Sequence, residues 1–150
     1  MNDLKFVNMK MRKVSLDKIN LINENTLIGA LGITVTELGD DYLIGKMPVD
    51  HRTTQPFGVL HGGASVVLIE SLGSIGSNLI IDNEKEFSVG LEVNANHISS
   101  VKDGFVFAKA RLVHLGKRTH VWSVNVYNEL SNKLICSGRL TMMIVQKNNK

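Results

Sequence analysis

The sequence predicts an α+β fold in which an antiparallel sheet wraps around one long, apolar helix. Residues 62–81 are rich in Val, Leu and Ile, contain no proline and carry one charge, Glu70. This length favours a helix, because strands rarely exceed about ten residues. Most of the remaining chain alternates apolar and polar residues between turn signals, which is typical of antiparallel strands. Such a sheet leaves an edge strand and an uncovered helix end, so we expect at least a dimer.

The other elements follow in chain order. A short helix is expected around residues 15–25. The run ITVTELGDDYLIGKMPV predicts two strands joined by a hairpin turn at 39–41. After the long helix, SVGLEVNANHIS, GFVFAKARLVHLG, THVWSVNVYNE and KLICSGRLTMMIV predict four more strands. The joints at 115–118 and 128–133 are short enough for antiparallel neighbours.

The composition is that of an ordinary globular protein. The chain has 150 residues, of which 43% are hydrophobic and 21% charged, and this predicts one domain over residues 1–150. The single cysteine, Cys136, cannot form an internal disulfide. No apolar run approaches the roughly 20 residues that span a bilayer, and the basic N-terminus lacks the apolar block of a secretory signal. We therefore expect a cytoplasmic protein without a membrane partner.

The net charge of +3 is spread along the chain, apart from the tail QKNNK and the pair Lys117 and Arg118. The sequence contains no helix-turn-helix, zinc-finger or RNA-platform pattern, so we expect no nucleic-acid partner. A mild positive charge fits small anionic ligands at least as well.

Glu70 is the only charge in the long helix. At helical spacing it shares a stripe with Gly63, Val67, Ser74 and Ser77. Gly73 and Gly76 each cost about 1 kcal/mol relative to Ala in a helix, which indicates close approach of another backbone or a ligand. One possibility is that the Glu70 carboxylate is buried and hydrogen-bonded to Ser74, Asn78 or a backbone amide, and another is that it faces solvent. The third is that it has a functional role.

His61, Gly62 and Gly63 stand where the helix begins, and the first amides of a helix lack intrahelical partners. Two glycines let a ligand oxygen approach these amides, as in an oxyanion hole. Alternatively, the glycines make the turn into the helix and His61 caps it. Together with Glu70 and with Gln55 on the loop before the helix, these residues suit a reaction at an activated ester. The Glu70 carboxylate would attack the ester carbonyl directly or activate a water molecule that attacks it.

Three ordered motifs, TQPFGVLHGGASVVLIESLGSIGS, VGLEVNANH and HLGKRTHVW, closely resemble the hotdog-fold thioesterases of the phenylacetic-acid-degradation type. The likeness covers roughly residues 27–146. It is strongest to members that act on aromatic acyl thioesters in menaquinone and enterobactin synthesis. The resemblance implies a sheet around a central helix, a dimer or a tetramer built of two dimers, and an active site between protomers.

The resemblance also implies site residues. Glu70 matches the catalytic carboxylate, and Gly62 matches the residue whose N–H polarises the thioester carbonyl. Gln55 and His61 match the pair that positions the reacting groups and assists the departing thiolate. Ser74 matches a hydroxyl near the acyl group and the attacking water. No metal or organic cofactor is implied, since coenzyme A is part of the substrate.

Further positions carry weaker predictions. Strict alternation places His97 on the same strand face as the apolar residues Val89, Leu91, Val93 and Ala95, so by itself it is expected in the core. The family resemblance instead implies a histidine beside an aromatic acyl ring at this position. The 116–119 turn reads as a charged hairpin turn on spacing alone. The family implies that this turn and the backbone around Val89 and Gly90 receive the coenzyme A nucleotide. The residues of the turn are Gly116, Lys117, Arg118 and Thr119.

Three functions stay open at this point. The first is hydrolysis of an aryl-CoA such as 1,4-dihydroxy-2-naphthoyl-CoA to the free acid and CoA. The second is hydrolysis of acyl groups from an acyl carrier protein, and the third is acyl-CoA binding without catalysis. The chain departs from near relatives at residues 98–100, Ile-Ser-Ser, where they often carry an arginine, and in its longer N-terminus.

Overall fold

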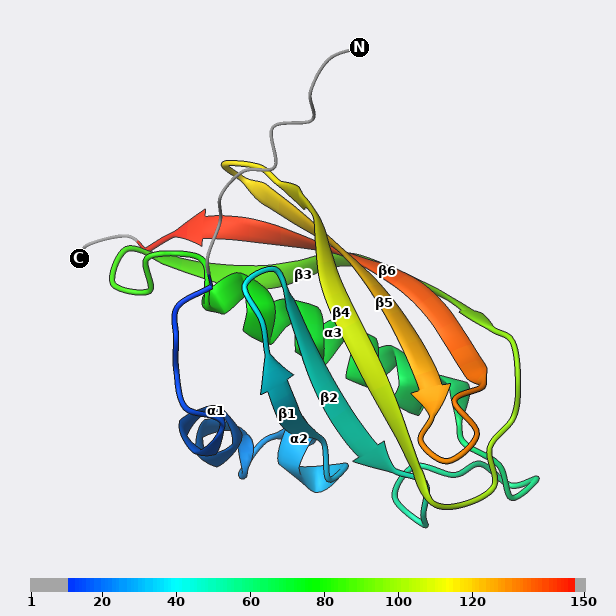
Figure 1. Ribbon diagram of the computed structural model, residues 1–150. Helices are drawn as coiled ribbons and strands as arrows, with labels where there is room; N and C mark the ends of the chain where they lie inside the picture. The colour runs from blue at the N-terminus through cyan, green and yellow to red at the C-terminus, as the bar shows by residue number, and fades with distance from the viewer. Residues whose placement is uncertain (1–10, 148–150) are drawn as a thin grey trace.

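A six-stranded antiparallel sheet curves around one long helix, as the ribbon view shows (Figure 1). This computed structural model describes residues 11–147. In chain order the elements are α1 (Leu16–Asn23), α2 (Leu27–Ala30), β1 (Thr34–Leu38), β2 (Tyr42–Pro48), α3 (Gly62–Asn78), β3 (Glu86–His97), β4 (Phe105–Leu115), β5 (Thr119–Asn128) and β6 (Leu134–Gln146). The predicted fold class is confirmed. The first ten residues, considered as a signal segment, and the last three of the basic tail lie outside the described residues.

The strand order is β1-β2-β4-β5-β6-β3, so β3 follows α3 in the chain but lies at the far edge of the sheet beside β6. At the other edge, the side chain of Asn20 in α1 binds the backbone of Val35 in β1. Its Nδ2 donates to the Val35 carbonyl at 3.0 Å, and its Oδ1 accepts from the Val35 N–H at 2.8 Å. This contact covers the β1 edge against further pairing. At the outer edge of β3, the Ser88 N–H donates to Asn78 Oδ1 of α3 at 3.4 Å, and within residues 11–147 no such contact reaches the stretch from Val89 to His97.

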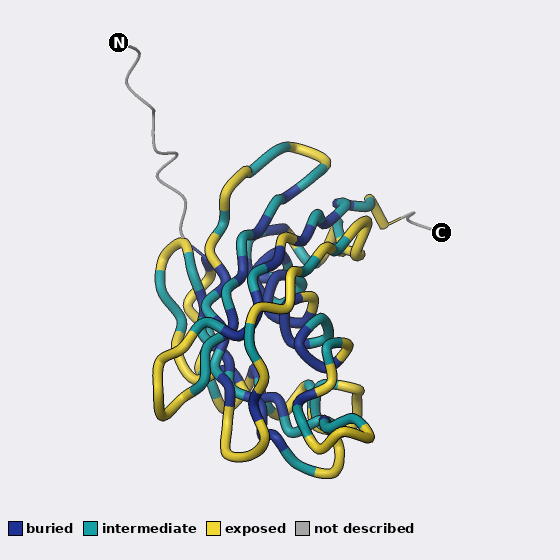
Figure 2. The backbone as a smooth tube through the Cα atoms, turned by 90° about the vertical axis from the view of Figure 1, so that its right-hand side faces the viewer, coloured by how far each residue is buried: buried dark blue, intermediate teal, exposed yellow. Residues whose placement is uncertain are grey.

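Helix α3 fills the concave side of the sheet, and the buried part of the chain gathers around it (Figure 2). Leu68, Ile69 and Leu72 are fully buried there. The two helix glycines are explained by close approach of sheet side chains. A Cβ on Gly76 would stand 2.5 Å from the Trp122 ring, and a Cβ on Gly73 would collide with Leu140.

Both ends of α3 are capped. At its start, the His61 ring Nδ1 accepts the Gly63 N–H at 2.8 Å. At its end, the backbone N–H of Arg12 donates to the Leu79 carbonyl at 2.9 Å, and the Arg12 guanidinium donates to the Asn78 carbonyl. A cation at this end complements the negative end of the helix dipole. Together these contacts fix the axis that carries Glu70.

Strand β3 contains a bulge, which makes one face prediction wrong. The register with β6 shifts between Gly90 and Glu92, so Leu91 is an extra residue. A bulge reverses the alternation of faces beyond it. Val93 and Ala95 therefore pack against the core, while Val89 and Leu91 are 36% and 57% exposed. His97 is also exposed, so the expectation of a core histidine fails.

Candidate active site

Glu70 lies on the open side of α3, against the backbone of β3. A Cβ on Gly90 would collide with Glu70 Oε1, so position 90 requires glycine while the carboxylate stays there. Glu70 is exposed in the single chain, and no ion pair of its carboxylate occurs within residues 11–147. Of the alternatives left open by the sequence, the solvent-facing carboxylate is the one observed in one chain.

The predicted stripe of α3 is open in its first part and covered at its end. Gly63 and Glu70 are exposed with Val67 half-buried between them, Ser74 is half-buried and Ser77 is fully buried. The strands of a twisted sheet cross a straight helix obliquely, so one stripe is open at one end and covered at the other. Glu70 and Ser74, one turn apart, are therefore the members that a ligand can reach from this side.

Gly62 begins α3 beside His97. A Cβ on Gly62 would stand 2.7 Å from His97 Nε2. Both residues line a cavity of about 390 Å³ together with Leu60, Ser65 and Ile135. Since the His61 ring takes the Gly63 N–H, and no hydrogen bond of the Gly62 N–H occurs in the described chain, this amide can donate to a ligand.

His61 acts as the cap of α3, as one reading of the sequence expected. Because Nδ1 accepts a hydrogen bond from the Gly63 N–H, the proton of the neutral ring must be on Nε2. His61 is exposed, so Nε2 faces outward as a donor. The capping contact thus selects the tautomer in which Nε2–H can donate a hydrogen bond to a departing group.

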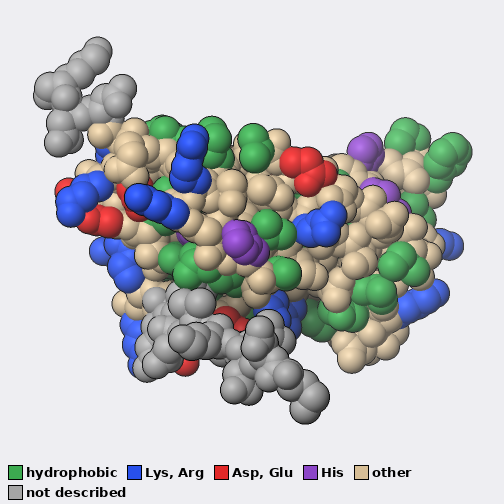
Figure 3. All heavy atoms as spheres, turned by 90° about the horizontal axis from the view of Figure 1, so that it is seen from above, with side chains coloured by type: hydrophobic (Ala, Val, Ile, Leu, Met, Phe, Trp, Pro, Cys, Tyr) green, Lys and Arg blue, Asp and Glu red, His purple; other side chains and the backbone are tan. Residues whose placement is uncertain are grey.

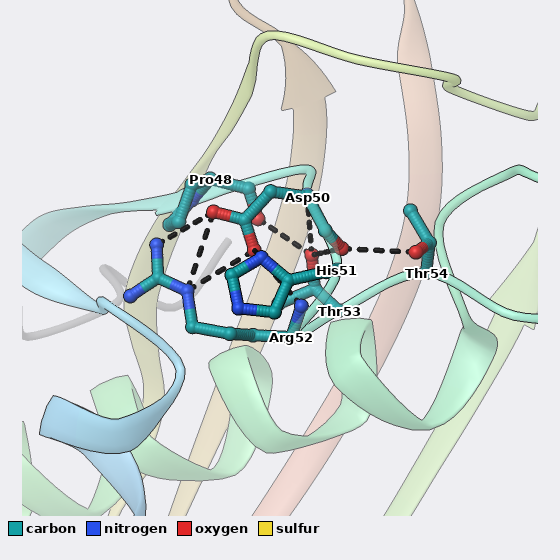
Figure 4. Close-up of polar contacts among 6 residues, drawn as sticks. All are labelled: Pro48, Asp50, His51, Arg52, Thr53 and Thr54. Carbon is teal, nitrogen blue, oxygen red and sulfur yellow. Dashed lines mark hydrogen bonds and ion pairs between the residues drawn. The ribbon is translucent and has the colours of Figure 1, made fainter.

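The loop between β2 and α3 is braced by a cluster that the sequence analysis missed (Figure 4). Thr53 is buried, and its Oγ1 donates to the Pro48 carbonyl at 2.7 Å. Asp50 forms an ion pair with Arg52 at 2.6 Å, and this hydrogen-bonded guanidinium lowers the pKa of Asp50 to about 2. Thr54 Oγ1 donates to the Asp50 carbonyl at 2.9 Å. The signal was an aspartate followed closely by hydroxyl residues after a strand, a pattern typical of turns.

Beyond this cluster the loop forms a narrow ladder that carries Gln55 and His61. The His61 N–H donates to the Thr53 carbonyl at 2.8 Å, and the Gln55 N–H donates to the Val59 carbonyl at 2.9 Å. The Gln55 side chain accepts the Phe57 N–H at 2.7 Å through Oε1. Its amide NH₂ group is thereby left to donate to a ligand.

One chain presents two half-sites rather than one complete site. Glu70 is eight residues from Gly62, which is about 12 Å along a helix. Glu70 contacts Gly90, whereas Gly62 contacts His97 at the other end of β3. The carboxylate half-site therefore holds Glu70 with Ser74, and the amide half-site holds Gly62 with His61 and His97.

The 116–119 turn lies at the carboxylate end of the sheet. The Gly116 N–H donates to the Thr119 carbonyl at 2.8 Å, and Lys117 and Arg118 are exposed. Thr119 pairs with Met143, which pairs with Val89. Two strand spacings, about 10 Å, therefore separate the turn from Val89 and the adjoining Gly90.

Comparison with known proteins identifies the family. The model of the thioesterase superfamily matches residues 57–135, which include both half-sites. The chain belongs to the thioesterase superfamily. It is a thioester hydrolase, and its sheet around α3 is the hotdog fold that the sequence predicted.

Named relatives of this thioesterase are similar over most of their length. It is 46% identical over 134 residues to a 1,4-dihydroxy-2-naphthoyl-CoA hydrolase of Escherichia coli (strain K12), covering 89% of this chain and 97% of that protein. A crystal structure of a mutant thioesterase from Pseudomonas aeruginosa matches with a TM-score of 0.89 and 45% identity, over 93% of this chain and 99% of the other. A crystal structure of a thioesterase from Haemophilus influenzae matches with a TM-score of 0.89 and 39% identity, over 95% of this chain and 99% of the other.

The surface of the thioesterase has no single strongly charged tract on the face seen from above (Figure 3). On this face the described residues place Lys and Arg side chains among Asp, Glu, His and hydrophobic ones. Over residues 11–147, no helix has the length and apolar character needed to cross a membrane.

If Glu70 is the catalytic carboxylate that the family resemblance implies, Gly90→Ala should lower kcat by about 10²-fold, because the added Cβ displaces that carboxylate and small misplacements of a reacting group carry costs of that size. Steady-state turnover of a thioester substrate measures the effect. The urea midpoint should change little, since Gly90 is exposed at an edge strand. Unchanged kcat would show that the carboxylate position set by Gly90 does not matter for turnover.

Proposed function

We propose that this thioesterase hydrolyses aryl-CoA esters, with 1,4-dihydroxy-2-naphthoyl-CoA or a related aromatic acyl-CoA as substrate. The products are the free acid and CoA. The observation that carries the proposal is the exposed Glu70 carboxylate held against Gly90, on the same end of the sheet as the basic 116–119 turn. The 46% identity to a hydrolase of that substrate supports the acyl group.

The proposed active site forms between two protomers paired through β3. This 12-residue strand lies at the edge of the sheet and leaves the apolar side chains of Phe87, Val89 and Leu91 exposed. Antiparallel pairing of two β3 strands about an axis at Asn94, with Leu91 left out of the register as the bulge residue, would set Gly90 opposite the partner's His97. Glu70 of one protomer then meets the partner's Gly62, which completes the site that one chain lacks. Family likeness further suggests that two such dimers form a tetramer.

In this arrangement the thioester carbonyl oxygen accepts the Gly62 N–H at the positive end of the α3 dipole. Glu70 either removes a proton from the attacking water or attacks the carbonyl carbon to form an anhydride that water then opens. In both cases the C–O bond forms as the C–S bond breaks. The proton given up by water ends on the departing thiolate, with His61 Nε2 and the Gln55 amide as donors beside it.

The acyl group has a suitable cavity next to Ser74. A space of about 400 Å³ between α1 and α3 is lined by Ser74 and by apolar side chains that include Ile19, Ile22 and Ile75. This volume lies within the range of about 300–1,000 Å³ typical of small-molecule pockets. The apolar side chains fit an aromatic ring, and Ser74, Arg12 and Lys18, which also line the space, can meet its polar substituents. His97 of the other half-site is a further hydrogen-bonding partner for a ring hydroxyl.

The double replacement Lys117→Ala and Arg118→Ala should raise KM for CoA esters about tenfold and leave kcat nearly unchanged, because the two cations bind phosphates that do not react. The difference should shrink at high salt, since both side chains are exposed. Lys133→Ala, on the turn between β5 and β6, is the matched control. Equal effects of the two changes would place the nucleotide elsewhere.

The proposed function is tested by thiol release from a panel of thioesters in buffer containing EDTA. We expect dihydroxynaphthoyl-CoA and benzoyl-CoA to be hydrolysed with higher kcat/KM than aliphatic CoA esters, without an added metal. The same acyl group on an acyl carrier protein serves as the comparison, and faster release from that carrier would favour the carrier-protein function. Tight binding of CoA esters without thiol release would favour a non-catalytic binding domain.

A further inference from the structure

Ser77, His120 and Trp122 form a buried hydrogen-bonded group between the end of α3 and the start of β5. Trp122 Nε1 donates to Ser77 Oγ at 2.8 Å, and His120 Nδ1 lies 3.1 Å from the same oxygen. His120 is 2% exposed, and the other two are fully buried. None of the three belongs to either half-site, so the group needs another explanation.

His120 directly follows the turn that we propose as the receiver of the CoA nucleotide. Its backbone pairs with Leu115 and Met142, and its side chain lines a cavity of about 400 Å³ that Gly116 and Lys117 also line. The imidazole therefore lies between the end of α3 and the 116–119 turn. Contact of His120 with Ser77 holds these two segments together.

Charged groups of both signs lie near His120. Asp82, Glu86 and Lys117 line the same cavity, and Lys85 forms an ion pair with Asp82 at 3.2 Å. The His114 ring, on β4, lies against Gly116, where a Cβ would stand 2.7 Å from its Nε2. Burial lowers the pKa of His120, the charge of protonated His114 lowers it further, and Glu86 opposes the shift. The buried ring is thus neutral at neutral pH.

We propose that neutral His120 is a positioning residue that holds the 116–119 turn against the end of α3, and that protonation of its ring releases the turn and weakens CoA binding. The second half of this proposal rests on the proposed function of the turn. A charged imidazolium is costly in the buried position. The adjoining cavity offers water and the carboxylates of Asp82 and Glu86, so the charged ring moves there and leaves Ser77.

The sign of the pH effect follows from the lowered pKa of His120. The contact contributes fully above the ordinary histidine value, about 6.5, and is lost as the pH falls through the lower value of the folded protein. CoA affinity should therefore decrease on acidification within this window. The three positions act on binding, since none of them touches the reacting atoms.

Trp122 is the only tryptophan, so its indole N–H reports directly on Ser77. We expect the indole N–H resonance of the wild type to show one transition below about pH 6.5, and His120→Gln to remove it. His114→Gln should move the transition to higher pH and Glu86→Gln to lower pH, because they remove opposite charges. A wild-type indole signal that does not change with pH, or shifts of the same sign in the two variants, would overturn the proposal.

Release of the turn from α3 should also loosen the turn itself, and amide hydrogen exchange at Gly116, whose N–H bonds the Thr119 carbonyl, measures this after correction for intrinsic exchange rates. Its protection should fall in the wild type over the same pH range and stay constant in His120→Gln. Protection that falls equally in both proteins would overturn the positioning role. CoA affinity, measured by calorimetry, should fall about tenfold with the loss of protection. If the turn is released but CoA affinity stays constant, the turn does not bind the CoA nucleotide, and the proposed coupling of His120 to CoA binding is wrong. The role of His120 in holding the turn is unaffected by that result.

Discussion

Glu70→Gln should lower kcat for thioester hydrolysis by about 10³-fold or more, with KM for the CoA ester close to that of the wild type. A neutral amide of the same shape can neither attack the carbonyl nor accept a proton from water. It still fits against Gly90, so ground-state binding is kept. Thiol release under saturating substrate measures the loss.

Glu92→Gln is the matched control, because it removes an exposed carboxylate from the strand that lies beside Glu70. We expect near wild-type turnover from this variant. Both proteins should unfold at the wild-type denaturant concentration, since exposed substitutions change stability by about 0.5 kcal/mol or less. Full turnover by Glu70→Gln would contradict a catalytic role and favour simple binding of acyl-CoA.

The kcat of Gly62→Pro should be about 10²–10³-fold lower than the kcat of Gly62→Ala, which is the expected effect of removing one oxyanion-hole donor. The pair of variants separates the N–H from the added side chain. Both place a Cβ near His97, but only proline removes the amide hydrogen. The comparison therefore measures the contribution of the N–H itself.

The backbone at this position accepts proline. Gly62 is the first residue of α3, where proline is favoured, and His61 has the extended conformation, φ −70° and ψ 131°, that suits a residue before proline. Circular dichroism should therefore show unchanged helix content. Equal kcat values for the two variants would show that the Gly62 N–H does not stabilise the transition state.

Much of the fold could be predicted because its signals are local. The charge-poor helix, the 39–41 turn and the alternating strands each occupy one short segment, and the structure has them in the expected places. Ser15 at the start of α1 is likewise a local capping signal, since its side chain accepts the Lys18 N–H.

The misses come from properties that depend on distant segments. The bulge at Leu91 is a property of the pairing between β3 and β6, so strict alternation placed Val89 on the wrong face. The burial of Ser77 depends on Trp122, 45 residues further along the chain. The Asp50 and Arg52 brace was missed because a polar run in a loop carries little information about which contacts it makes.

The candidate site was predicted as a set of residue types but not as a geometry. Helical spacing shows that Glu70 and Gly62 share one helix, and the same spacing separates them by about 12 Å. The order of motifs along one chain gives no information about residues that a second protomer contributes to the site. The exposed edge of β3, visible only once the strand order is known, supplies the reason for proposing that the site spans two protomers.

Mixed dimers of Glu70→Gln and Gly62→Pro protomers test the account most directly. If Glu70 works with the partner's Gly62, a mixed dimer contains one site with both lesions and one intact site. Co-expression with two different affinity tags yields the mixed species, whose kcat per dimer should approach half that of the wild type. If both residues act within one chain, every site is damaged, and the mixed dimer should be as inactive as its two parents.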